Sequence, residues 1–291
     1  MENPFSLKKL NIFNNLFLSI VSLILLLGCS GDGDDPDPSN NTNPPATLVE
    51  TFQIDLSAQY SIPANTSSNA TGMVTLELFS DNSLKYSITV SGMANTDVLT
   101  TAHIHLGDLV STGIISMTLV DGTDRTFNGN TASGSINISN QEKNILQGND
   151  IYLNVHSNNY PSGLVRGSID EDIDFAMDIY LSPNNNVPPL MGRSETGTAF
   201  LRLSSESVLY YKININDLDM SDELKSAHIH TAMTGETGPV FQTLGVDPSD
   251  FEVSKSFLLN EADRMSFLTD YLYVNVHTDQ EQAGLMRGQI R

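Results

Sequence analysis

The chain contains one domain-sized sequence twice, and this duplication constrains its fold more than any other feature. The segment TGMVTLELFSDNSLKYSITVSGM at 71–93 aligns without a gap with TGTAFLRLSSESVLYYKININDL at 196–218. The same offset of 125 residues relates TAHIH to SAHIH, and near the end of each copy an offset of 121 relates YLNVH to YVNVH. The sequence therefore predicts two tandem domains, which we place at 49–171 and 172–291.

Each copy has the alternating pattern that is typical of β-strands. Segments such as MVTLELF, KYSITV and IYLNVH alternate apolar with polar residues, and turn residues such as SDNS, DGT and NGN separate them. Only residues 260–270 suggest a helical turn or two. The pattern predicts an all-β protein built from two antiparallel sandwiches or barrels, each of immunoglobulin-like size.

Residues 1–28 have the pattern of a bacterial lipoprotein signal peptide. Lys8 and Lys9 precede an apolar run at 16–27, which is too short to span a bilayer comfortably, and the motif LLGC then ends at Cys29. Cys29 is therefore the predicted lipidation site. The alternative is an unprocessed hydrophobic anchor with an incidental cysteine. Because this cysteine is the only one in the chain, no intramolecular disulfide can form.

Residues 29–48 are acidic and rich in proline and asparagine, which predicts a solvated tether. Ser30 and the acidic run after it are similar to the sorting signals of Gram-negative lipoproteins. We therefore expect an outer-membrane lipoprotein of the cell envelope, anchored through Cys29 and exposed at the cell surface. The formal net charge of −21 would repel phosphate backbones, so nucleic acid is excluded as a partner.

All six histidines lie in the repeated motifs. Strand alternation places Ala102, Ile104 and Leu106 on the core face and the two histidines between them on the opposite face. The YLNVH motif likewise directs Tyr152, Asn154 and His156 outward, and YVNVH directs Asn275 and His277 outward. The candidate metal ligands are therefore His103, His105 and His156 in the first copy, and His228, His230 and His277 in the second.

Side chains two residues apart on a strand project in parallel, roughly 6–7 Å apart, and a neighbouring strand can supply a third ligand. Three imidazoles with one open position can hold Zn²⁺, and imidazole also suits copper. Copper, with one ion per domain, is the candidate cofactor. Two alternatives stay open: the histidines are exposed polar positions that never meet, or they form a hydrogen-bonded cluster without a ligand.

The motifs AHIH, a Gly-Pro-Val segment, YVNVH and G-L-x-R-G-x-I together resemble the CHRD domain, a family named from chordin and common in bacterial secreted proteins. The resemblance covers both copies nearly end to end. The first copy departs from it, with STGII where the second has TGPVF. The resemblance implies an all-β, immunoglobulin-like fold and supplies no settled activity.

A fainter resemblance is to copper–zinc superoxide dismutase, which has a His-x-His strand, a Gly-Pro loop, a later Val-His, and an arginine before a Gly-x-Ile strand. Val240 stands where that family has a zinc-site histidine, and the bridging histidine and disulfide are absent, so the resemblance implies neither that zinc site nor dismutase activity. It implies a superoxide-dismutase-like fold with copper held by His228, His230 and His277 beside Arg287, or by His103, His105 and His156 beside Arg166.

Two further pairs of polar residues are candidate site residues. Arg166 and Arg287 would bind an anionic ligand near the metal, or else form a salt bridge or bind backbone carbonyls at the end of a strand. Asn154 and Asn275 would orient a histidine from behind, or else are simply outward polar positions.

Two function classes remain. One is a non-enzymatic surface module that binds a protein, glycan or matrix partner. The other is a metal-site protein that handles copper in the envelope or acts as a copper-dependent oxidoreductase. The sequence has no G-x-S-x-G or H-E-x-x-H motif and no phosphate-binding glycine-rich loop, and its carboxylates are scattered, so hydrolysis is a distant third.

Overall fold

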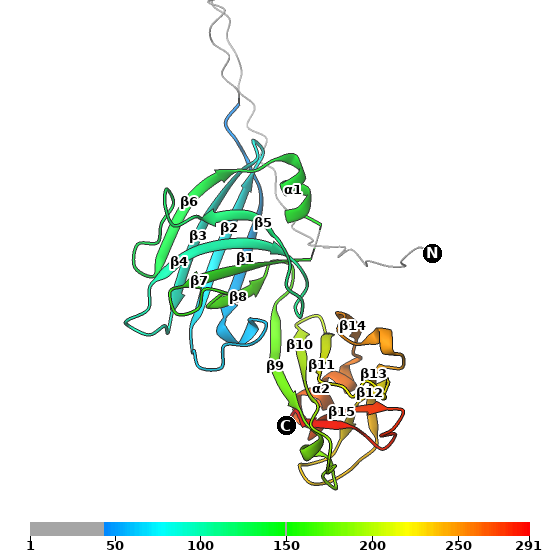
Figure 1. Ribbon diagram of the computed structural model, residues 1–291. Coiled ribbons are helices and arrows are strands. Elements are labelled where there is room, and N and C mark those ends of the chain that lie inside the picture. Colours follow the sequence, from blue (N-terminus) through cyan, green and yellow to red (C-terminus); the bar gives the residue numbers. More distant parts are fainter. Residues whose placement is uncertain (1–43, 149) are drawn as a thin grey trace, which may run out of the picture. The chain divides into compact units, whose positions relative to one another are not determined.

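The computed structural model describes residues 44–148 and 150–291, which form antiparallel sheets with two short α-helices (Figure 1). The predicted signal peptide, Cys29 and most of the predicted tether lie outside the described residues. Residues 44–47 of that tether are exposed and precede the first strand, which begins at Leu48. Within the described part of the chain, every helix is too short or too polar to cross a membrane.

The strands repeat in the same order in the two domains. The first domain contains β1 (Leu48–Ser57), β2 (Thr71–Phe79), β3 (Ser83–Ser91), β4 (Leu99–Leu106), β5 (Ile115–Val120), β6 (Thr131–Asn137), α1 (Asn140–Leu146), β7 (Ile151–Ser157) and β8 (Val165–Ser168). The second contains β9 (Ile173–Leu181), β10 (Thr196–Ser204), β11 (Val208–Asn216), β12 (Leu224–Thr231), β13 (Val240–Gly245), β14 (Lys255–Leu258), α2 (Glu261–Thr269), β15 (Leu272–Thr278) and β16 (Met286–Gln289).

In the first domain all eight strands join one sheet in the order β5-β4-β7-β8-β1-β2-β3-β6, which curves into a nearly closed barrel (Figure 1). The second domain has two four-stranded sheets, β14-β11-β10-β9 and β13-β12-β15-β16. The strand pairing of the two domains differs at one position. Ser57 pairs with Arg166 to join β1 to β8, whereas the equivalent pair Ser182 and Arg287 is an isolated bridge. The all-β, antiparallel prediction is confirmed, and an equivalent residue pair connects the two halves of each domain.

Each domain buries its own apolar core. In β2, for example, Val74, Leu76 and Leu78 are fully buried, as the period-2 alternation requires. In β4 and β12, which carry the His-x-His motifs, Ala102, Ile104, Ala227 and Ile229 are also fully buried, while Leu106 at the end of β4 is partly buried. Their position anchors these two strands, so the histidines between them are held on a rigid sheet.

The helices were predicted from the sequence less completely than the strands. Helix α2 follows its N-cap Asn260 and occupies the segment for which a helical turn or two was expected. Helix α1 was not predicted from the sequence. It begins at a capping box in which Ser139 and Glu142 bond each other's backbone N–H groups, and this local motif stabilises a helix too short to show periodicity.

Replacement of Phe267, the fully buried residue of α2, tests the core of the second domain. The ring packs edge-on against Phe175 with ring centroids 5.2 Å apart. We expect Phe267→Ala to lower the free energy of unfolding by about 3–5 kcal/mol, because the cavity adds to the lost apolar burial. Met265→Ala, at an exposed position of the same helix, is the control and should change it by less than about 0.5 kcal/mol in the same urea titration.

Candidate metal centre

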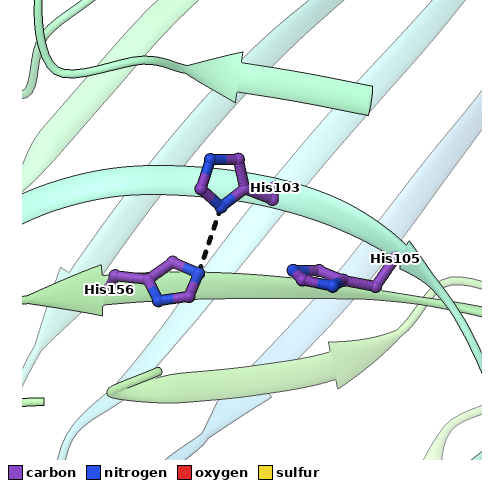
Figure 2. A group of neighbouring side chains, drawn as sticks. All are labelled: His103, His105 and His156. Carbon is purple, nitrogen blue, oxygen red and sulfur yellow. Dashed lines mark hydrogen bonds between the residues drawn. The ribbon is translucent and has the colours of Figure 1, made fainter. Parts of the chain in front are cut away.

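Each domain brings its three histidines together on the outer face of its sheet. His103 and His105 lie on β4, and His156 lies on β7, the antiparallel neighbour of β4. One nitrogen atom from each ring lies within 4.8 Å of the others (Figure 2). The alternative in which the histidines never meet is therefore wrong. The second domain has the same arrangement on β12 and β15, with His228, His230 and His277.

Backbone carbonyls determine which nitrogen of most of these rings carries the hydrogen. In the first domain, Nδ1 of His105 donates to the Gly113 carbonyl and Nδ1 of His156 donates to the Pro161 carbonyl, each at 3.0 Å. A carbonyl oxygen can only accept, so the neutral ring must keep its hydrogen on Nδ1 and its lone pair on Nε2. In the second domain His230 donates to Gly238 and His277 to Gln282, also at 3.0 Å.

In the second domain the remaining nitrogens converge without hydrogen-bond partners in the protein. In the second domain Nδ1 of His228 and Nε2 of His230 and His277 are all buried and have no hydrogen-bond partner. In the first domain Nδ1 of His103 donates a hydrogen bond to Nε2 of His156 at 3.1 Å (Figure 2). An ion held by both of these nitrogens would take the place of that hydrogen. A metal ion bonded at about 2.0–2.1 Å holds its nitrogen ligands about 3.3–3.6 Å apart. The nitrogens of each triad lie within 4.8 Å of one another, so side-chain adjustments would bring them to this spacing around an ion.

Two glycines allow the carbonyls to reach the histidines. A Cβ atom on Gly113 would lie 2.0 Å from the Leu106 carbonyl, and one on Gly238 would lie 1.8 Å from the Thr231 carbonyl. Because no real Cβ atom fits at such distances, the β4–β5 and β12–β13 loops can return this close to their own strands only at glycine. The same glycines supply the carbonyls that orient His105 and His230.

Burial keeps five of the six imidazoles neutral. All six histidines are half-buried. Burial, together with the neighbouring His156 and His105, lowers the pKa of His103 from its ordinary 6.5 to about 4. Burial also lowers the pKa of His105, His156, His228 and His277. Neutral imidazole is the form that binds a metal, so these rings are prepared as ligands at neutral pH.

A tyrosine that was not among the predicted site residues supports each site. The ring of Tyr152 stacks on His105 with centroids 4.9 Å apart and a tilt of 8°, and the Arg166 guanidinium lies 3.5 Å from the centre of the same ring. In the second domain Tyr273 stacks on His230 at 4.9 Å and 9°, with Arg287 at 3.5 Å. The signal was present in the sequence, because YLNVH and YVNVH place this tyrosine on the same face as the histidine.

The two arginines bond backbone oxygens of the loop that follows the His-x-His strand. Arg166, 4% exposed, donates to the Asp108 carbonyl. Arg287, 3% exposed, donates to the carbonyls of Glu236 and Met233 and to the side chain of Gln289. These contacts correspond to the carbonyl-binding interpretation of the two residues.

The two asparagines lie near the histidines without a hydrogen bond to them. Asn154 donates from Nδ2 to the Ser162 carbonyl and so holds the β7–β8 loop, which supplies the carbonyl for His156. Its Oδ1 is buried and unpartnered, as is Oδ1 of Asn275. Gly163 and Gly284 pack against these amides at positive φ, where a Cβ atom would clash. Asn154 can therefore orient His156 only indirectly, by holding the β7–β8 loop that supplies the Pro161 carbonyl.

The outward face of β7 is less exposed than strand alternation predicts. Tyr152 and Asn154 point away from the core, as expected, yet they are only 3% and 8% exposed. The loops after β4 and β7 fold back over this face and cover them. Alternation gives the face of a side chain correctly but does not show what covers that face.

The family model of the CHRD domain matches the chain twice, at residues 52–169 and 177–290. The chain belongs to the CHRD family. The predicted tandem CHRD organisation is thereby confirmed, and both matches fall within the expected limits of 49–171 and 172–291. No curated protein and no solved structure matches the chain, so the fainter resemblance to copper–zinc superoxide dismutase receives no support.

The low pKa of His103 predicts how the metal-free protein responds to pH. The folded state takes up this proton near pH 4, whereas the unfolded chain takes it up near pH 6.5. The stability that the neutral ring contributes is thus complete above about pH 6.5 and is lost as the pH falls through about 4. NMR titration of the imidazole signals, assigned with His103→Gln, measures this pKa directly. A midpoint near 6.5 in the folded protein would contradict the burial of this ring.

Proposed function

We propose that each CHRD domain binds one transition-metal ion through its three histidines, with copper as the ion, and that the protein is a non-enzymatic metal-binding module. The observation that carries this proposal is the convergence of three imidazole nitrogens in each domain. In two rings of each triad, a backbone carbonyl holds the hydrogen on the nitrogen that points away from the other rings. A cluster that served only to hydrogen-bond its own members would not leave three buried nitrogens without partners, as the second domain does.

The donor set favours copper or zinc over hard cations. Imidazole suits both metals, whereas Ca²⁺ and Mg²⁺ take oxygen ligands. Among the described residues, neither triad is joined by an aspartate, glutamate or cysteine. A surface groove in the first domain borders His105, Tyr152 and Arg166, which gives an ion and an additional small ligand access to one side of the triad.

The cellular setting of the proposal comes from the N-terminal sequence alone. Lipidation at Cys29 would place the two domains on the envelope of a Gram-negative bacterium, where they would meet metal ions before the cytoplasm does. A protein or glycan partner at the cell surface is the alternative function of the tandem domains. Copper-dependent redox chemistry is the alternative function of the triads, and an activity assay on the copper-loaded protein distinguishes it from metal storage or transfer.

Metal content measured by mass spectrometry, after titration with Cu⁺, Cu²⁺ and Zn²⁺, tests the proposal. We expect two tightly bound ions per chain. The pairs His103→Ala/His105→Ala and His228→Ala/His230→Ala should each reduce the content to one ion, because each removes two of three ligands from one domain.

Matched controls separate ligand loss from damage to the strand. Thr101→Ala in β4 and Ser226→Ala in β12 alter the same strands beside the histidines and should leave two ions bound. Absence of tight binding to the unmodified protein would disprove the metal site, as would full binding by the double-histidine variants. The search for a function would then move to partners at the cell surface.

A further inference from the structure

A buried positive charge accompanies each histidine triad. In both domains one aromatic ring contacts a ligand imidazole and a guanidinium, through Tyr152 in the first domain and Tyr273 in the second. The guanidinium carbons lie 3.5 Å from the ring centres. The repetition of this stack in two diverged copies indicates that it belongs to the site rather than to one local packing accident.

No carboxylate of the described residues forms a salt bridge with either guanidinium. The hydrogen bonds of Arg166 and Arg287 go to backbone carbonyls and one amide oxygen, which are neutral groups. Both side chains are almost fully buried. The Asp108 carboxylate lies near enough to Arg166 to offset part of its charge, whereas no carboxylate of the described residues acts in this way on Arg287. A buried cation raises the energy of any further positive charge placed close to it, because little solvent is present to screen the repulsion.

The ligand set itself brings no negative charge. Three neutral imidazoles leave the charge of the bound ion unchanged, and no acidic residue or cysteine of the described chain joins either group. A divalent ion would keep both of its charges beside the guanidinium, whereas a monovalent ion would keep one. Cu²⁺ moreover prefers four or more ligands in a tetragonal arrangement, and Zn²⁺ prefers four in a tetrahedron. Monovalent copper has a filled d shell and accepts three nitrogen ligands.

We infer that each triad is a site for monovalent copper, and that Arg166 and Arg287 are the residues that set this preference. The inference rests on the metal site proposed above and adds the oxidation state of the ion. For charges about 8 Å apart in an effective dielectric of about 20, one unit of charge changes the relative affinity for monovalent and divalent ions by about thirtyfold.

Anaerobic competition titrations test the inference on the full-length protein. Cu⁺ is titrated against bicinchoninate and Cu²⁺ against glycine, which gives one dissociation constant for each oxidation state. We expect the protein to bind Cu⁺ at least about a hundredfold more tightly than Cu²⁺, since coordination number and charge act in the same direction.

The arginine variants then test the cause of the preference, one domain at a time. With the second triad removed by His228→Ala/His230→Ala, Arg166→Met should reduce the preference for Cu⁺ by about thirtyfold, and Arg287→Met should do the same when the first triad is removed. Arg125→Met is the matched control, because this arginine of the first domain already pairs with Asp121 and should leave the ratio unchanged.

The outcomes separate this inference from the proposed function. Two ions per chain with Cu²⁺ bound as tightly as Cu⁺, or an unchanged ratio in a folded Arg166→Met variant, would overturn the inference and leave the metal site standing. Failure to bind either ion would overturn both. If the arginine variants do not fold, the ratio measured on the unmodified protein still decides whether the sites prefer Cu⁺.

Discussion

Hydrogen bonds from histidine Nδ1 to backbone carbonyls are the constraint on which the rest of the candidate site depends. A neutral imidazole has one hydrogen and one lone pair, and either nitrogen can carry the hydrogen. The carbonyls of Gly113 and Pro161 fix the hydrogens of His105 and His156 on the outer side of the triad. The lone pairs must then point inward. Without these bonds either tautomer could form, and only the one with its hydrogen on Nδ1 could bind an ion through Nε2.

The fold supplies these carbonyls through the loops that follow the two histidine-bearing strands. Gly113 in the first domain and Gly238 in the second let the loop after the His-x-His strand return against that strand. The loop after the other histidine-bearing strand, β7 or β15, supplies the second carbonyl. Because only the backbone is used there, the side chain is free to vary. Pro161 in the first copy and Gln282 in the second make the same hydrogen bond at 3.0 Å. The two copies have thus diverged in sequence while keeping the same geometry around the triad.

The repeat and the strand alternation were sufficient to predict the all-β tandem fold and the face that the histidines occupy. They were sufficient because a strand has one dominant periodicity, so Ile104 and Leu153 in the core fix the direction of their neighbours. Loop paths have no such periodicity. The burial of Tyr152, the carbonyl partners of Arg166 and the tautomers of the histidines all depend on where loops return, and they required the structure.

The stacking of tyrosine on histidine was not predicted because it depends on how two strands pair. Strand alternation showed that Tyr152 shares a face with His156, but the pairing that places it opposite His105 depends on the register between β4 and β7. A shift of β4 by one residue would have moved His103 and His105 to the core face. Register is a property of two strands and the loops around them, so neither strand reports it alone.

Anomalous X-ray diffraction from crystals of the copper-loaded protein tests the central claim most directly, because it locates the ion relative to named atoms. The account predicts two copper peaks per chain, one in each domain. Each should lie about 2.0–2.1 Å from three imidazole nitrogens, with Nε2 as the ligand atom of His105, His156, His230 and His277. Copper at any other position, or bound through Nδ1 of those four histidines, would contradict it.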